Sequence, residues 1–295
     1  MEALEMKVGF IGIGLMGLPM CRRLLQAEVE LFVFNRNGAK CEPLVKEGAA
    51  QLSSIQEIAE KCDIVMICVS NTQSVESVVE SLMPELKPKQ IIIDFSSISP
   101  DATKQLAAAV EKKGASWIDS PVSGGVAGAE AGTLAIMVGG SQADLDRVKP
   151  LLQPLSQRVT LMGPNGSGQT TKICNQMIVS CNVLVMAEVL AMAKKSGVDA
   201  SKIPLALQGG FADSTPLQLT GTRMADQEFD EVKWHVKTLL KDLDMANELA
   251  KNVSSAVPMA GLGAELMRQH ASKGFEDQDP ATLIGLYEKI ESSET

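Results

Sequence analysis

Apolar runs and helical patterns alternate along the first part of the chain. Runs of Val, Ile, Leu and Phe, bounded by glycine, proline or polar residues, predict buried strands. The expected strands are Lys7–Ile11, Glu30–Phe34, Ile64–Val69, Gln90–Asp94, Ser116–Ser120, Leu134–Val138 and Val159–Met162. Helices are expected between them, one ending near Ala27 and others over Ile55–Lys61 and Asp101–Lys113. Strands that alternate with helices are typical of a parallel, doubly wound sheet, so an α/β fold is expected.

Only helical patterns follow the glycine-rich segment Gly163–Gly168. The expected helices are Gln169–Ser196, Ser201–Gln208, Trp234–Lys251, Met259–Ser272 and Pro280–Ser292. This change of pattern predicts a sheet domain over residues 1–165 and an all-α C-terminal domain over residues 166–295, linked by the first and longest of these helices.

The segment Ile173–Ala193 is apolar on nearly every side of its helix. The polar residues that interrupt it are Asn175, Gln176, Ser180, Asn182 and Glu188. It therefore lacks the uninterrupted span of about 18 apolar residues expected of a membrane helix. A helix that is apolar all round is buried in a core or at an interface. We therefore expect no membrane insertion, and we expect a homodimer or homotetramer.

Composition and charge exclude several classes of protein. The chain has 27 Lys and Arg against 36 Asp and Glu, a formal net charge of −9, which argues against a nucleic-acid surface. Its six cysteines are scattered and form no C-x-x-C pair, so neither a disulfide framework nor a metal site is expected. Free thiols and the lack of a signal-peptide pattern before the first strand lead us to expect a cytoplasmic protein.

A glycine fingerprint lies between the first strand and the first helix. The apolar run Val8–Ile11 leads directly into Gly12, Gly14 and Gly17, which form G-x-G-x-x-G. In this setting the first glycine allows a tight turn, the second lets the backbone approach a pyrophosphate, and the third lets helix and strand pack closely. The unpaired N–H groups of the helix N-terminus favour phosphate. A dinucleotide-binding domain of the Rossmann type is therefore expected.

The end of the second expected strand bears on which dinucleotide binds. An acidic residue there favours NAD, because it accepts hydrogen bonds from the adenosine ribose. This chain has Asn35 and Arg36 instead. The neutral amide does not repel a 2′-phosphate, and the guanidinium can bind it with a planar fork. NADP(H) is therefore favoured over NAD(H), although Arg36 could also be an ordinary solvated loop residue.

Three further segments can carry chemistry. The segment Asp119–Gly125 reads D-S-P-V-S-G-G and can form a small anion-binding concavity or a plain turn. The loop Gly163–Gly168 enters the apolar helix, with Lys172 and Asn175 on one helix face. That lysine is either used or extends to water. The segment Lys241–Ala246, K-D-L-D-M-A, is by itself an ordinary charged helix face.

The order of these four motifs resembles that of the β-hydroxyacid dehydrogenase family, which includes 3-hydroxyisobutyrate dehydrogenase and tartronate semialdehyde (2-hydroxy-3-oxopropionate) reductase. The resemblance extends from Lys7 to about Lys289. It implies an oxidoreductase that transfers a hydride between NADP(H) and a small 3-hydroxy acid or its semialdehyde.

The resemblance also implies the roles of individual residues. Lys172 corresponds to the general acid/base, and Asn175 to the residue that orients the substrate beside it. Lys241 corresponds to a lysine near both substrate and nicotinamide. The residues expected to hold the substrate carboxylate are Ser123, Gly124 and Gly125. The other residues expected at the cofactor are Gly12, Ile13, Gly14, Leu15, Met16, Gly17, Asn35, Arg36, Val69, Ser70 and Ser97.

Some positions depart from the family pattern. Val69 and Ser70 stand where members often have Leu-Pro, Trp234 where Phe is common, and Val232 where many have Pro. The substrate pocket is therefore expected to differ from that of the better-known members.

Three alternatives remain. Imine reductases resemble this family with the lysine replaced, so Lys172 argues against that activity. 6-Phosphogluconate dehydrogenase resembles the first domain but needs a longer helical domain. A non-catalytic NADP-binding module is expected to lose the lysine, yet Lys172, Asn175 and Lys241 are all present.

Overall fold

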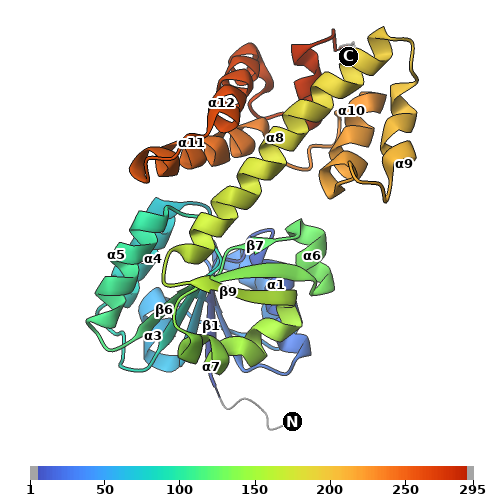
Figure 1. Cartoon of the computed structure of the whole chain (residues 1–295). Helices are drawn as coiled ribbons and strands as arrows, with labels where there is room; N and C mark the ends of the chain where they lie inside the picture. Colours follow the sequence, from blue (N-terminus) through green and yellow to red (C-terminus); the bar gives the residue numbers. More distant parts are fainter. Residues whose placement is uncertain (1–5, 291–295) are drawn as a thin grey trace. The chain divides into compact units, whose positions relative to one another are not determined.

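A computed structural model describes residues 6–290 of the chain. The chain divides into two compact units, Met1–Lys172 and Ile173–Thr295. Figure 1 shows that the first unit holds the sheet and the second is helical. The division falls inside helix α8 (Ser167–Lys195), the long helix that the sequence predicts to link the two domains.

Within residues 6–290, nine strands form one sheet in the order β3-β2-β1-β4-β5-β6-β8-β7, with β9 paired to β8. The strands are β1 (Val8–Ile11), β2 (Leu31–Phe34), β3 (Ala50–Gln51), β4 (Ile64–Ile67), β5 (Ile91–Asp94), β6 (Ser116–Asp119), β7 (Val122–Ser123), β8 (Leu134–Gly139) and β9 (Ser156–Gly163). All neighbours from β3 to β6 are parallel. This is the dinucleotide-binding strand order, whose ligands lie outside the carboxyl ends of the strands at the point between β1 and β4 where the order reverses.

The sheet is mixed rather than wholly parallel. Strand β8 runs antiparallel to β6 and β7, and only β9 is parallel to it. The short strands β3 and β7 have two residues each and leave no apolar pattern in the sequence, so they were not expected. The expected strand Ile64–Val69 ends at Ile67, because the Val69 N–H donates to a serine side chain instead of to a neighbouring strand.

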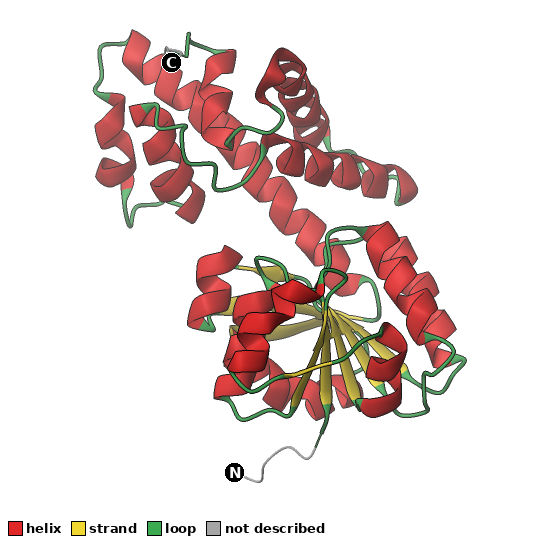
Figure 2. Cartoon of the chain, turned by 180° about the vertical axis from the view of Figure 1, so that it is seen from behind, coloured by secondary structure: helices red, strands yellow, loops and turns green. Residues whose placement is uncertain are grey.

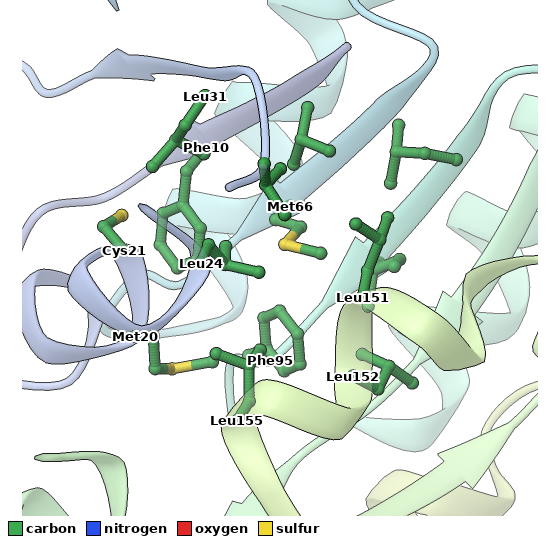
Figure 3. Close-up of a cluster of buried hydrophobic side chains, with 14 of the residues drawn as sticks. Phe10, Met20, Cys21, Leu24, Leu31, Met66, Phe95, Leu151, Leu152 and Leu155 are labelled. Atoms are coloured by element: carbon green, nitrogen blue, oxygen red, sulfur yellow. The ribbon is translucent and has the colours of Figure 1, made fainter. Parts of the chain in front are cut away.

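Two hydrophobic cores cover the two faces of the sheet, and Figure 2 shows helices on both. Side chains alternate along each strand, so Phe10 and Met66 enter one core while Ile11, Val65 and Ile67 enter the other. The first core is closed by α1 (Gly17–Gln26), α2 (Glu42–Lys46), α6 (Gly125–Ala131) and α7 (Gln142–Leu152), and the second by α3 (Ile55–Lys61), α4 (Thr72–Leu82) and α5 (Pro100–Glu111). In the first core, the Phe10 ring stacks with that of Phe95 at a centroid distance of 6.3 Å (Figure 3).

The second unit packs its helices around a core of its own. Besides most of α8, from Ile173 onward, its α-helices are α9 (Ile203–Leu207), α10 (Thr222–Asp226), α11 (Val236–Asn252) and α12 (Pro258–His270). Its shorter helical turns are Ala200–Lys202, Leu217–Gly221, Ala271–Phe275 and Pro280–Leu286. The fully buried Asp279 carboxylate lies 2.8 Å from the Arg223 guanidinium and also accepts from the Ala281 N–H, which fixes the last of these turns to α10.

The final helix is shorter than the sequence pattern suggests. A helix was expected over Pro280–Ser292, but a 3₁₀ turn ends at Leu286, and Ser292 lies outside the described residues. The chain folds back there, and Ile290 packs so closely on Gly285 that a Cβ at Gly285 would lie 2.5 Å from the Ile290 Cδ1.

In the first unit, helices α4 and α7 were not expected from the sequence. Both begin at polar caps, where Asn71 and Ser141 accept from the backbone N–H three residues ahead.

Helix α8 is, among the described residues, the one helix whose length and apolar character would allow a membrane span. Its apolar side chains nevertheless divide into two groups. Val183, Ala187, Leu190 and Ala191 are buried in the core of the second unit. A stripe that comprises Ile178, Val185, Val189 and Met192 is exposed, so the core of this unit buries only part of the helix.

Candidate active site

The glycine fingerprint adopts the geometry that a dinucleotide needs. Gly12 has φ of 104°, and a Cβ there would lie 2.2 Å from the Cys68 carbonyl oxygen. A Cβ at Gly17 would lie 2.0 Å from the Gly12 oxygen, so helix α1 packs directly on the turn. Gly14, by contrast, has nothing within 4 Å of its Cβ position. The backbone is therefore open at the glycine that a pyrophosphate approaches, and the residues present fit a dinucleotide.

Asn35 is built into this loop. Its Oδ1 accepts from the Ile13 N–H at 3.0 Å, and its Nδ2 donates to the Asn37 carbonyl at 2.9 Å. It thus ties the end of β2 to the glycine turn, a contact that the sequence did not indicate. Arg36 beside it is exposed, and within residues 6–290 no hydrogen bond or ion pair engages its guanidinium. A free, exposed guanidinium at this strand end is suited to bind a phosphate.

The loops after β4 and β5 are joined by Ser96. Its buried Oγ accepts from the Val69 N–H at 3.0 Å, and its own N–H donates to Asp94 Oδ1 at 2.9 Å. Burial raises the pKa of Asp94 to about 7, and its Oδ2 has no partner within the described residues. The expected cofactor residues Val69, Ser70 and Ser97 lie on these two loops, and this network holds the loops together.

A carboxylate at the end of β6 caps helix α8. Asp119 Oδ1 accepts from the Gly166 N–H at 2.8 Å, and Oδ2 accepts from the Gln169 N–H at 3.0 Å. Burial raises the pKa of Asp119, and these N–H bonds act in the opposite direction. A Cβ at Gly168 would lie 2.4 Å from the Met137 oxygen, so the first turn packs directly on the sheet. The half-buried Lys172 follows in the second turn and is thereby fixed to the strand ends.

The segment Ser123–Gly125 links β7 to α6. Gly124 has φ of 132° and Gly125 has φ of 62°, conformations that disfavour any residue with a Cβ. Gly125 has nothing within 4 Å of its Cβ position. The segment is exposed at both glycines and half-buried at Ser123. It therefore presents a hydroxyl and backbone groups without a covering side chain, as the expected carboxylate site requires.

In the second unit, a hydrogen-bonded chain connects Asn175 and Lys241. Asn175 Nδ2 donates to Gln176 Oε1 at 2.8 Å, and Gln176 Nε2 donates to Asp242 Oδ2 at 2.5 Å. The Lys241 Nζ lies 3.3 Å from Asp242 Oδ1. The structure thus brings these two expected residues together through Gln176 and a nearly buried carboxylate. Gln176 and Asp242 were not among the site residues expected from the sequence. Two features pointed to them: Gln176 is a polar residue within an apolar helix, and Asp242 is an acid directly after Lys241.

The comparisons with known proteins agree with this arrangement. Residues 7–163 match the family model of the NAD binding domain of 6-phosphogluconate dehydrogenase. Residues 166–287 match the model described as NAD-binding of NADP-dependent 3-hydroxyisobutyrate dehydrogenase. The 2-hydroxy-3-oxopropionate reductase of Escherichia coli K12 is 39% identical over 283 residues, which are 95% of this chain and 96% of the reductase. The chain belongs to the 3-hydroxyisobutyrate dehydrogenase, or β-hydroxyacid dehydrogenase, family.

Solved structures of similar proteins match nearly the whole length of this chain. The 3-hydroxyisobutyrate dehydrogenase of Mycobacterium tuberculosis with L-serine has a TM-score of 0.86 at 26% identity, and the match covers 95% of this chain and 98% of that one. The protein Psf3 in complex with NADP⁺ and 2-OPP has a TM-score of 0.85 at 26% identity, covering 95% of this chain and 100% of that one. As a member of the β-hydroxyacid dehydrogenase family, the chain is an NAD(P)-dependent oxidoreductase of the 3-hydroxy acid dehydrogenase type.

Proposed function

We propose that this enzyme interconverts a small 3-hydroxy acid and its semialdehyde, uses NADP(H) in preference to NAD(H), and employs Lys172 as general acid/base. The observation that carries the proposal is the place of Lys172 in a helix that Asp119 fixes to the strand ends. The names of the relatives support the substrate class, because 3-hydroxyisobutyrate and 2-hydroxy-3-oxopropionate are both small carboxylates.

The chain's residues divide the work of the reaction among them. A bound nicotinamide supplies or accepts the hydride at the carbon that carries the oxygen. Lys172 donates a proton to that oxygen as negative charge develops, and in the reverse direction its neutral amine accepts the alcohol proton. In the second unit, Asn175 and Lys241, joined through Gln176 and Asp242, are the residues that we propose contact the substrate. Holding the reactants in this way makes the step effectively unimolecular.

The carboxylate of the substrate is held by Ser123, Gly124 and Gly125 in this proposal. The net charge of −9 repels anions, so local donors must overcome it. One hydroxyl and two backbone N–H groups supply these donors, and the positive charge of Lys172 adds attraction. A substrate carboxylate also accounts for the two glycines, Gly124 and Gly125, because a residue without a side chain leaves its backbone N–H open to the carboxylate.

Cofactor choice depends on the end of β2. The side chain of Asn35 is an uncharged amide that accepts a hydrogen bond from the glycine turn. This strand end therefore has no carboxylate to repel a 2′-phosphate. The exposed Arg36 supplies the guanidinium that binds it.

The test is a screen of semialdehydes and 3-hydroxy acids with NADPH and NADH, followed at the nicotinamide absorbance. A good semialdehyde acid is then compared with the plain aldehyde of the same length, such as propanal. Loss of the carboxylate should lower kcat/KM by about 10²-fold or more, because the charge-assisted hydrogen bonds to Ser123, Gly124 and Gly125 are lost. A ratio near one, or a preference for the plain aldehyde, contradicts the carboxylate assignment.

A further inference from the structure

Gln169 is a buried polar side chain that the proposed chemistry does not use. It lies in the first turn of α8, three residues before Lys172, and is 1% exposed. Its Oε1 accepts from the Ile98 N–H at 3.1 Å, and its Nε2 donates to the Ser96 carbonyl at 2.7 Å. Both ends of the amide are therefore occupied by the backbone of one loop, the segment after β5.

This loop is joined in turn to the loop after β4. Ser96, whose carbonyl accepts from Gln169, also accepts from the Val69 N–H through its Oγ. The Gln169 N–H itself donates to Asp119 at the end of β6. Gln169 thus joins the helix that carries Lys172 to the loop that carries Ser97, and Ser96 joins that loop to the one that carries Val69.

We infer that Gln169 is a positioning residue for the hydride-transfer step, which fixes the loops beside the nicotinamide relative to Lys172. This inference rests on the proposed function. Hydride and proton must reach adjacent atoms of one substrate, and a displacement of about 1 Å can slow such a step about 10²-fold. An amide held at both ends has one orientation, whereas an apolar side chain of the same length fills the space without fixing the loop.

The experiment compares the wild type with Gln169→Met, which keeps the length of the side chain and removes both of its hydrogen bonds. We expect kcat to fall by about 10- to 100-fold. The Kd for NADPH, measured by fluorescence, and the KM for the substrate should change less than about 3-fold, because neither binding group is removed. With NADPH deuterated at the transferred position, the isotope effect on kcat should rise, since hydride transfer becomes the slow step.

Gln90 provides the matched control. It lies just before β5, at the opposite end of the strand from Ser96, and is also buried. Its Nε2 donates to the Ala59 and Cys62 carbonyls at 2.7 and 2.6 Å, and its Oε1 accepts from the Lys87 N–H at 2.6 Å. Gln90→Met should lower Tm at least as much as Gln169→Met but leave kcat and its isotope effect unchanged.

A second variant covers the case in which Gln169→Met folds poorly. Gln169→Leu removes the same two hydrogen bonds without placing a charge in this buried site, so a comparable fall in kcat with a raised isotope effect is expected. If folded Gln169 variants lose Tm but keep the wild-type kcat and isotope effect, Gln169 is only structural and the inference fails. A wild type that turns over no 3-hydroxy acid or semialdehyde overturns the proposed function instead.

Discussion

At the scale of single residues, Lys172 carries the heaviest chemical demand. Lys172→Ala should lower kcat by about 10²-fold or more, because the developing charge loses both its stabilising ammonium and its proton donor. Binding of NADPH, followed by fluorescence, should survive. Lys104→Ala, which alters an exposed lysine of α5, is the control and should leave kcat unchanged. A Lys172 variant with near-normal turnover would remove the assignment.

Arg36 is the residue on which cofactor choice depends. Arg36→Ala should weaken NADPH binding by about 10-fold or more and leave NADH binding nearly unchanged, because only the 2′-phosphate loses its charged partner. Titrating both cofactors against each variant measures this directly. Equal losses for the two cofactors would make Arg36 a structural residue and remove the reason to favour NADP(H).

Individual elements show what the sequence could predict and why the rest was hidden. The strand, turn and helix from Val8 to Gln26 were predictable because the apolar run and the glycine spacing are local. Asn35 and Arg36, at the end of the second strand, were expected from the same local pattern, whereas Val69, Ser70 and Ser97 were expected from the family resemblance. The hydrogen bonds of Asp119 to Gly166 and of Gln169 to Ser96 join positions far apart in the chain, so no local pattern records them.

The helical half was harder to predict in detail. Helix α8 was recognised from its apolar composition, but composition alone could not separate its buried side chains from the exposed stripe. The helices Leu217–Gly221 and Thr222–Asp226 were not expected, since neither is long enough to show a full amphipathic period. Tertiary packing, rather than local propensity, decides such short elements.

The glycine turn before α1 allows a prediction at the scale of this element. Gly14→Ala should leave the Tm of the unliganded protein unchanged, because nothing lies within 4 Å of the new Cβ. It should still weaken NADPH binding, since the methyl group occupies the space through which the pyrophosphate approaches the backbone. Gly12→Ala serves as contrast and should lower Tm, because its Cβ would lie 2.2 Å from the Cys68 oxygen. Unchanged NADPH affinity in Gly14→Ala would place the pyrophosphate elsewhere.

At the scale of the whole molecule, the exposed stripe of α8 requires an explanation. Ile178, Val185 and Met192 recur every seven residues and are 70%, 44% and 63% exposed. Val189 lies between them and is also exposed. A long helix with an exposed apolar stripe is typical of a face that another subunit covers. A second copy of this chain fits, because the stripe is uncharged apart from Glu188 and two copies of a chain with net charge −9 need an apolar contact to associate.

We therefore predict a homodimer or homotetramer whose interface includes this stripe. Met192→Glu should shift the molar mass in light scattering toward that of one chain, because burying a carboxylate against a second copy is costly. Its cost to the folded chain itself should be small, since Met192 is already exposed. Lys251→Glu, at an exposed position of α11, changes charge away from the stripe and should leave the mass unchanged. A wild type that is monomeric at working concentration would contradict the prediction, and an oligomer that Met192→Glu leaves intact would place the interface on another face.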